Sequence, residues 1–181
     1  PLVRDDDSLW ARQEHAVASW PADTIALEHE SGHLSYGMLN AQADALAAVL
    51  RNVLGLEQYA IVGVHHTRCF EQMLSVLAIR KAGCVYMPLD PGYPTSRRQH
   101  MLVDSGCRVV LGMPHDDLAD GVPGVAFLSC ATLLGLAHGV PRVSVVDHPA
   151  QAPVYTIYTS ASTGRPKGVV DTAAGLSNFL D

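Results

Sequence analysis

Hydroxyl side chains, glycines and one lysine are gathered in the segment 158–168, whose order is Y-T-S-A-S-T-G-R-P-K-G. A loop of this composition can point several backbone N–H groups and hydroxyl groups toward an anion. The glycines Gly164 and Gly168 allow the backbone to bend and approach a ligand closely. The lysine adds a positive charge suited to polyphosphate. The candidate nucleotide-binding residues are Thr159, Ser160, Ser162, Thr163, Gly164 and Lys167.

This segment is not a Walker A loop, in which the pattern G-x-x-x-x-G-K-[ST] runs into a helix at the lysine. Here Pro166 precedes Lys167 and Gly168 follows it, and Val169-Val170 is typical of a strand. The apolar residues 154–158 before the loop also predict a strand. We therefore expect the order strand, phosphate loop, strand. A plain surface loop rich in serine, threonine and glycine is the alternative that composition leaves open.

A second segment matches a sequence pattern of known chemistry, the zinc-binding pattern H-E-x-x-H, but we reject this interpretation. The segment His29-Glu30-Ser31-Gly32-His33 fits H-E-x-x-H, which binds zinc when both histidines lie on one face of a helix. Ser-Gly favours a turn over a helix interior. We therefore expect a hairpin turn with solvated histidines. His65-His66 follows a predicted strand and is interpreted as structural or solvated, so no metal site is predicted.

Composition excludes several classes of function. The chain has 181 residues, a formal net charge of −6 and no basic stripe, which argues against a nucleic-acid partner. No run approaches the roughly 18 apolar residues of a membrane helix. The four cysteines form no C-x-x-C pair and three lie in apolar runs. Buried thiols in a reducing compartment fit this pattern, so we expect a cytoplasmic protein.

The elements that must position the loop alternate along the chain. Residues 1–7 are an expected linker, and residues 8–181 are expected to form one partial domain. Ser35 and Thr95 are predicted N-caps, and Gly106 is expected to end the helix that Thr95 begins. The pattern predicts an α/β domain with a mostly parallel sheet flanked by helices. Helices are expected at 9–20, 39–51, 70–82 and 95–104, and strands at 24–27, 34–36, 60–64, 84–89, 108–111, 125–128, 143–146 and 154–159.

The order of residues in three segments resembles a known family. Residues 158–169 are similar to the phosphate-binding signature Y-T-S-G-S-T-G-x-P-K-G-V of adenylate-forming, AMP-binding enzymes, in the form typical of nonribosomal peptide synthetases. Residues 81–94 resemble the family segment K-A-G-x-A-Y-V-P-L-D-P-x-Y-P, and residues 101–105 continue it. Residues 34–40 resemble L-T-Y-x-E-L-N. The chain is identified as the N-terminal portion of the large subdomain of an adenylation domain.

The resemblance implies a chemistry. Such domains use ATP, with Mg²⁺, to convert an amino acid to an aminoacyl-adenylate and pyrophosphate, and then load a carrier protein. The loop would hold the β- and γ-phosphates. Neighbouring condensation and carrier domains, and an MbtH-like protein, would be the partners. Secondary-metabolite or antibiotic biosynthesis would be the setting. Asp90, Pro91 and Pro94 would fix a turn, and Tyr36 and Leu39 would lie in the core.

Departures from the family pattern argue against activity of this chain alone. Ala161 replaces a loop glycine, which costs about 1–2 kcal/mol if that residue is left-handed. Asp171 puts a charge in an expected strand, and Ala173-Ala174-Gly175-Leu176 replaces a histidine followed by Arg-Gly-Leu. The family's amino-acid pocket and C-terminal lid have no counterpart in these residues. The alternative is a catalytically inactive remnant that serves as a docking module. The remaining departures are Met38, Ser96 and Arg98.

Overall fold

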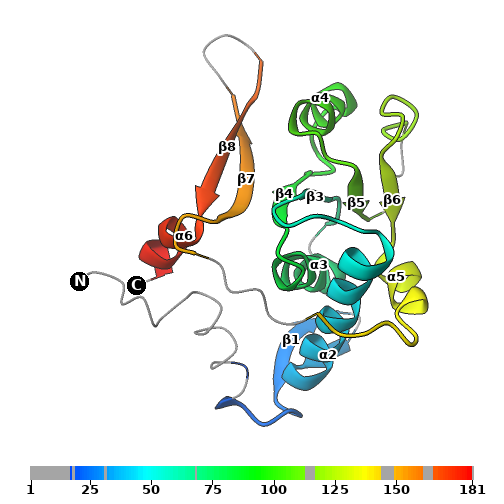
Figure 1. Cartoon of the computed structure of the whole chain (residues 1–181), viewed down its shortest axis with the longest axis vertical. Coiled ribbons are helices and arrows are strands. Elements are labelled where there is room, and N and C mark those ends of the chain that lie inside the picture. Colours follow the sequence, from blue (N-terminus) through cyan, green and yellow to red (C-terminus); the bar gives the residue numbers. More distant parts are fainter. Residues whose placement is uncertain are drawn as a thin grey trace.

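The computed structural model describes residues 17, 19–30, 32–67, 69–112, 117–143, 149–160 and 165–180. Within these residues a six-stranded sheet carries helices on both faces, and a two-stranded hairpin precedes it in the chain (Figure 1). This is the α/β fold that the sequence predicts. The strands are β1 Ile25–His29, β2 Gly32–Ser35, β3 Ile61–Val64, β4 Val85–Pro88, β5 Val109–Leu111, β6 Ala126–Leu128, β7 Pro153–Thr159 and β8 Lys167–Thr172.

The helices connect these strands and cover the sheet. Figure 1 shows the central strands between α4 on one side and α2, α3 and α5 on the other. The helices are α2 Tyr36–Ala48, which continues into the π-helical segment η1 Val49–Val53, α3 Phe70–Lys81, α4 Thr95–Ser105, α5 Cys130–Leu136 and α6 Ala173–Leu180.

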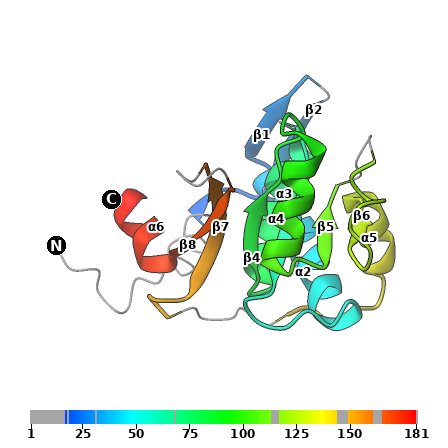
Figure 2. The ribbon, with the colours of Figure 1, turned by 90° about the horizontal axis from the view of Figure 1, so that it is seen from above.

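The order of the main sheet is β6-β5-β3-β4-β7-β8. Figure 2 shows β6, β5, β4, β7 and β8 following one another across the view in this order. Strand β3 runs parallel to β4 on one side and to β5 on the other, and β4 runs parallel to β7. The chain therefore leaves β3 toward β4 and then crosses back to β5. In open α/β sheets of this kind, ligands bind outside the carboxyl ends of the strands, close to where the order reverses. The carboxyl edge of β3, β4, β5 and β7 is therefore the place to look for a site.

Alternating residues of the central strands pack against opposite layers, as the two-residue period of a strand requires. Val62, Val64 and Leu111 join a core with apolar residues of α2, α3 and α5. Met87 and Val110 point the other way and pack with apolar residues of α4. Both faces of the sheet are thus buried, which accounts for the nearly continuous apolar runs of these strands in the sequence.

Two of the predicted helix ends are confirmed and one is wrong. Ser35 Oγ accepts a hydrogen bond from the backbone N–H of Met38 at 3.2 Å, so it is the N-cap of α2. Gly106 ends α4 with φ of 66°. Thr95 is not a cap: it is the first residue of α4, and Pro94 precedes it without a capping side chain. The hydroxyl group of Thr95 instead accepts a hydrogen bond from Arg98 at 3.2 Å.

Helices α5 and α6 were not predicted, although each has a local signal. Ser129 Oγ accepts from the backbone N–H of Thr132 at 3.0 Å and caps α5. Thr172 Oγ1 accepts from the backbone N–H of Gly175 at 3.3 Å at the start of α6. Residues 1–16 and 144–148 lie outside the described residues, so the linker at 1–7, most of the helix at 9–20 and most of the strand at 143–146 stay predictions.

The H-E-x-x-H segment forms the β1–β2 hairpin, as predicted, and not a helix. Glu28 pairs with His33 and His29 pairs with Gly32 in an antiparallel register. Both histidines are exposed, but the ring of His29 also meets the edge of Phe70, with 5.7 Å between ring centroids. The helical face that the zinc chemistry requires is therefore not built here.

The cysteines are free thiols, and Cys84, Cys107 and Cys130 are buried, as predicted. Burial raises the pKa of Cys84 and of Cys107 to about 11. None of the helices in the described residues is long and apolar enough to cross a lipid bilayer.

Candidate nucleotide site

The predicted order of strand, loop and strand is confirmed. Strands β7 and β8 form an antiparallel hairpin in which Tyr158 pairs with Gly168 and Thr159 pairs with Lys167. The loop therefore starts at the carboxyl end of β7, on the same edge of the sheet as the carboxyl ends of β3, β4 and β5. Figure 1 shows the hairpin extending well beyond the ends of the other strands.

Three of the six candidate residues lie within the described part of the loop. Thr159, Ser160 and Lys167 are exposed, and Thr159 and Lys167 stand opposite each other at the base of the loop. Ala161, together with the candidates Ser162, Thr163 and Gly164, lies outside the described residues. The structure thus brings one hydroxyl group and the lysine together at one end of the hairpin.

Gly168 lies in β8 beside Tyr158, and a Cβ atom at this position would be 3.1 Å from Tyr158 Cζ and 3.3 Å from Thr156 Cγ2. Contacts of this length are tighter than most that a Cβ atom makes, so a side chain here would require Tyr158 or Thr156 to shift. The missing side chain therefore leaves room for the tyrosine ring across the hairpin.

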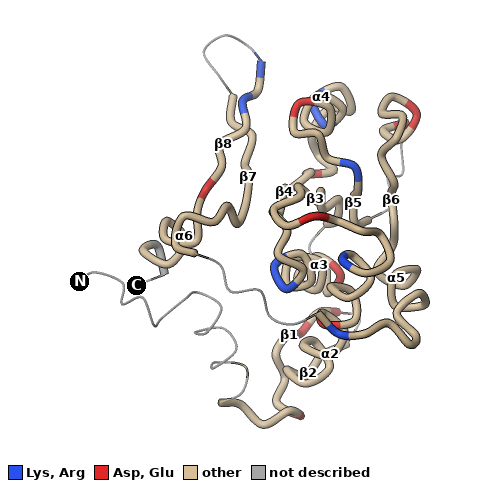
Figure 3. Tube along the Cα trace, viewed as in Figure 1, with Lys and Arg blue, Asp and Glu red and all other residues tan. Residues whose placement is uncertain are grey.

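The described residues around the loop carry positive charge. Arg165 and Lys167 are exposed on the returning side of the loop, and the guanidinium group of Arg97 lies 4.0 Å from the centroid of the Tyr93 ring. Figure 3 shows basic residues at the start of β8, and both basic and acidic residues on α4. A local excess of cationic donors at a hydroxyl-rich loop suits a polyphosphate.

Tyr158 anchors the end of β7 in the sheet. Its side chain is buried, and its hydroxyl group donates a hydrogen bond to Asp104 Oδ2 at 2.7 Å. Burial and this bond to the carboxylate raise the pKa of the Tyr158 phenol. The phenol therefore stays protonated and keeps donating over the whole physiological range.

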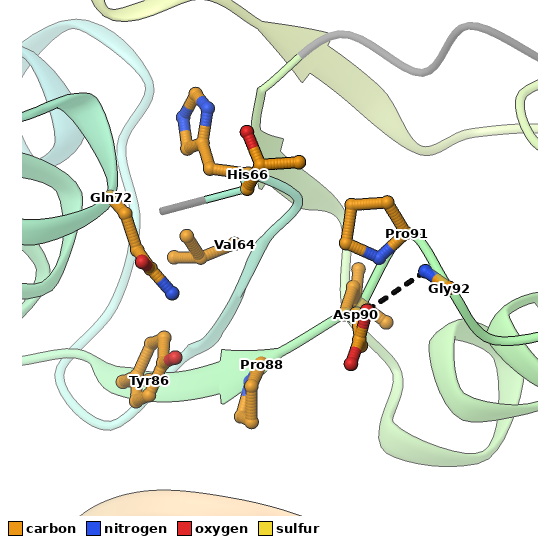
Figure 4. Close-up of a pocket in the computed structure, with 10 residues that line it drawn as sticks. Val64, His66, Gln72, Tyr86, Pro88, Asp90, Pro91 and Gly92 are labelled. Atoms are coloured by element: carbon orange, nitrogen blue, oxygen red, sulfur yellow. Dashed lines mark hydrogen bonds between the residues drawn. The ribbon is translucent and has the colours of Figure 1, made fainter. Parts of the chain in front are cut away.

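A cavity of about 410 Å³ opens on the same edge, at the carboxyl ends of β3 and β4. Figure 4 shows Gln72 of α3 and Tyr86 of β4 on one side and the turn 90–92 on the other. Val64 and Leu89 form part of its apolar lining. The sequence does not indicate this cavity, because its lining residues come from three elements that are separate in the chain.

The histidine pair after β3 is divided between two environments. His65 is buried, and its Nε2 atom lies 2.8 Å from Nη1 of the buried Arg98. Because a guanidinium group only donates, Nε2 of His65 must be the acceptor. His66 lines the cavity, and burial lowers its pKa, opposed by the nearby carboxylate of Glu71. The structural interpretation of the pair thus holds for His65, whereas His66 faces the cavity.

The predicted turn after β4 is confirmed. Asp90 Oδ1 accepts from the backbone N–H of Gly92 at 2.8 Å, and the backbone carbonyl of Asp90 accepts from the N–H of Tyr93 at 3.0 Å. Leu39 is buried, as predicted, whereas Tyr36 is only half-buried and stacks on Trp20.

Asp171 has structural partners, which the sequence did not reveal. Its Oδ2 accepts from the hydroxyl group of Tyr155, and its Oδ1 accepts from the backbone N–H of Thr172 at 2.8 Å. The bond to Asp171 raises the pKa of Tyr155. A Cβ atom at Gly175 would collide with the Asp171 carboxylate. The missing side chain of Gly175 therefore leaves room for the Asp171 carboxylate. Hydrogen bonds from Tyr155 and Thr172 account for the presence of this charge in β8.

The chain matches a family model described as AMP-binding enzyme over residues 13–181. Among curated proteins, phosphinothricin tripeptide synthetase PhsB of Streptomyces viridochromogenes is 37% identical over 188 residues. That match covers 97% of this chain but 15% of the relative, so the chain spans a small part of the curated protein.

Two solved structures are similar over nearly the whole chain. The N-terminal subdomain of Klebsiella oxytoca NpsA, in complex with 3-hydroxyanthranilyl-AMSN, has a TM-score of 0.76 and 27% identity, covering 95% of this chain and 43% of that one. The nonribosomal peptide synthetase FmoA3 in its AMPPNP-bound form has a TM-score of 0.81 and 28% identity, covering 98% of this chain and 18% of that one.

Proposed function

Because the chain belongs to the AMP-binding enzyme family and matches part of nonribosomal peptide synthetases, we propose that its parent activity is the ATP-dependent activation of an amino acid. In that reaction the amino-acid carboxylate attacks the α-phosphate of ATP, an aminoacyl-adenylate forms, and pyrophosphate leaves. A carrier-protein domain accepts the aminoacyl group, and a condensation domain and an MbtH-like protein are the further proposed partners.

The observation that carries the proposal is the hairpin loop at the carboxyl edge of the sheet. Thr159 and Lys167 stand opposite each other at its base, and both are exposed. A lysine and hydroxyl groups are donors that match phosphate oxygens. We assign to Thr159, Ser160, Ser162, Thr163, Gly164 and Lys167 the role of holding the β- and γ-phosphates.

The contribution of these residues is positioning and charge neutralisation. Phosphate chemistry leaves little covalent work to the protein, so holding the leaving pyrophosphate in place is the main task of such a loop. Lys167 would offset charge that builds up on the pyrophosphate oxygens. Mg²⁺ would enter bound to the nucleotide and screen the same charge. We assign no catalytic residue and no metal ligand to the described part of this chain.

Binding of MgATP to the 181-residue chain, followed by calorimetry, tests the site. We expect Lys167→Met to weaken binding by tenfold or more, since one charge-assisted hydrogen bond is worth about 1.5–3 kcal/mol. Arg108→Met is the matched control, because Arg108 is also an exposed cation but lies at the opposite end of the sheet, before β5. Equal binding by both variants, or no binding by the native chain, would contradict the proposal.

The alternative proposal is an inactive remnant that acts as a docking module. The observation that favours it is an exposed apolar strip on the outer face of the hairpin, formed by Ile157 and Val169, which pair across the two strands. It predicts that the parent protein gives no ATP–pyrophosphate exchange with any amino acid. It also predicts that Ala161→Gly alone does not restore nucleotide binding. Exchange by the parent protein would exclude this alternative.

A further inference from the structure

We propose that one face of α4 positions the phosphate loop through three side chains, here called the α4 clamp: Arg97, His100 and Asp104. This inference rests on the proposed function of the loop. None of the three belongs to the loop or to its two strands. They are spaced at i, i+3 and i+7, which places them on one face of a helix. All three bond to the ends of β7 and β8, where the loop begins and returns.

Asp104 holds the first side of the loop through a side chain. Its Oδ2 accepts the hydrogen bond of the Tyr158 hydroxyl group at 2.7 Å. Tyr158 is 5% exposed and immediately precedes Thr159, the first candidate phosphate ligand. Hydrogen bonds to an ionised acceptor are among the stronger ones in proteins. The bond therefore fixes the direction in which the chain leaves the sheet.

Arg97 holds the same side through the backbone. Its Nη2 donates to the carbonyl oxygen of Tyr158 at 3.3 Å. The guanidinium group also lies over the ring of Tyr93, at 4.0 Å from the centroid, in the turn that leads into α4. This cation–π contact keeps Arg97 from rotating into solvent. The end of β7 is thus tied to α4 at two atoms of one residue.

His100 holds the returning side. Its Nε2 lies 3.1 Å from the carbonyl oxygen of Pro166, which directly precedes Lys167. Because a carbonyl oxygen only accepts, Nε2 carries the proton and donates. The same ring meets the ring of Tyr158 edge-on, at an angle of 81° with 6.4 Å between centroids. His100 therefore contacts both sides of the loop at once.

The consequence is a loop with both ends fixed before a ligand arrives. A loop that must be ordered on binding loses conformational entropy at that moment, which weakens affinity. With its ends held by α4, less of this entropy remains to be lost. The α4 clamp is therefore expected to act on binding of the β- and γ-phosphates, and not on contacts to the adenosine part of the nucleotide.

The test compares ligands with and without these phosphates on the 181-residue chain. Tyr158→Phe and His100→Ala each remove one hydrogen bond, worth about 0.5–1.5 kcal/mol, or roughly two- to tenfold in affinity. We expect this loss for MgATP and for inorganic tripolyphosphate, and less than a twofold change for AMP. Asp104→Ala should behave like Tyr158→Phe, whereas Asp104→Asn retains an acceptor and should restore most of the affinity.

Ser96→Ala is the control on the same helix, because Ser96 is exposed and outside the α4 clamp. Amide hydrogen exchange of the ligand-free chain supplies a second measurement. Exchange at 156–160 and 165–170 should become faster in Tyr158→Phe and His100→Ala but stay unchanged in Ser96→Ala. Unchanged exchange in all variants would overturn the α4 clamp, and so would an equal loss of affinity for AMP and ATP.

The two proposals fail in different ways. A native chain that binds neither MgATP nor tripolyphosphate contradicts the proposed nucleotide site, and hydrogen exchange alone then decides whether α4 orders the hairpin. A native chain that binds MgATP while every α4 variant binds it equally well contradicts the α4 clamp and leaves the nucleotide site in place.

Discussion

On the buried face of β7, two hydroxyl groups differ in their contribution to the stability of the fold. Thr156 and Tyr158 both point into the protein and are 3% and 5% exposed. Tyr158 donates to Asp104, whereas Thr156 Oγ1 is buried with no hydrogen-bond partner among the described residues. A buried polar atom without a partner costs about 1–3 kcal/mol. Thr156 is therefore a position at which the native residue is not the most stable one.

We expect Thr156→Val to raise the free energy of unfolding by about 1 kcal/mol, because a methyl group of the same shape replaces the unpaired hydroxyl group. Urea denaturation of the two chains measures the difference. Thr67→Val is the control, since Thr67 is exposed and its substitution should change stability by less than about 0.5 kcal/mol. A loss of stability in Thr156→Val would mean that the hydroxyl group has a partner after all.

Among the elements, helix α2 has only one of the two hydrogen bonds of a capping box at its N-terminus. Ser35 caps its first turn, but no acidic residue lies there, and Met38 stands where a glutamate would return a hydrogen bond to the backbone of Ser35. Met38 is 52% exposed, so its side chain contributes little to the core. Further along the helix, Asp44 of α2 forms an ion pair with the buried Lys81 of α3. The distance between Asp44 Oδ1 and Lys81 Nζ is 2.8 Å.

Ser35→Ala should lower the free energy of unfolding by about 1 kcal/mol, because one backbone N–H at the start of the helix loses its acceptor. Met38→Glu should raise it by about 0.5–1 kcal/mol, through the second bond of the capping box and the helix dipole. Chemical denaturation of both single variants and the double variant measures the coupling. If Met38→Glu stabilises equally with and without Ser35, the capping-box explanation is wrong.

On the scale of the whole molecule, the hairpin of β7 and β8 differs from the rest of the sheet. The central strands are buried on both faces, whereas the outer face of the hairpin is open. Ile157 and Val169 pair across the two strands and are 44% and 54% exposed. An exposed apolar strip on an edge hairpin is a site for association with another surface.

We expect the double variant Ile157→Thr with Val169→Thr to reduce self-association of the 181-residue chain without loss of secondary structure, because threonine keeps the β-branched shape and removes apolar surface. Sedimentation velocity over a range of concentrations measures the association. Val103→Thr is the control, because Val103 is an equally apolar side chain that is 71% exposed on α4 and does not belong to the strip. Equal association of the double variant and the native chain would show that the strip is not the contact surface.

The sequence by itself determined the features that depend on residues close together in the chain. The strand–loop–strand order around Lys167, the serine that caps α2 and the glycine that ends α4 were all predicted, because each depends on residues close together in the chain. The alternation of apolar runs predicted the α/β fold for the same reason. Helices α5 and α6 were missed, since they have only 7 and 8 residues and only Ser129 and Thr172 mark their starts.

Contacts between distant residues were decided only by the tertiary structure. Asp104 and Tyr158 are 54 residues apart, and His100 and Pro166 are 66 apart. Nothing in the local pattern of α4 indicates that its exposed face would meet a hairpin formed much later in the chain. The fold brings them together because β7 inserts beside β4, and this parallel pairing places the loop next to the helix that follows β4. The residue types of the loop can therefore be read from the sequence. The contacts with α4 that hold its ends depend on the order of the strands in the sheet.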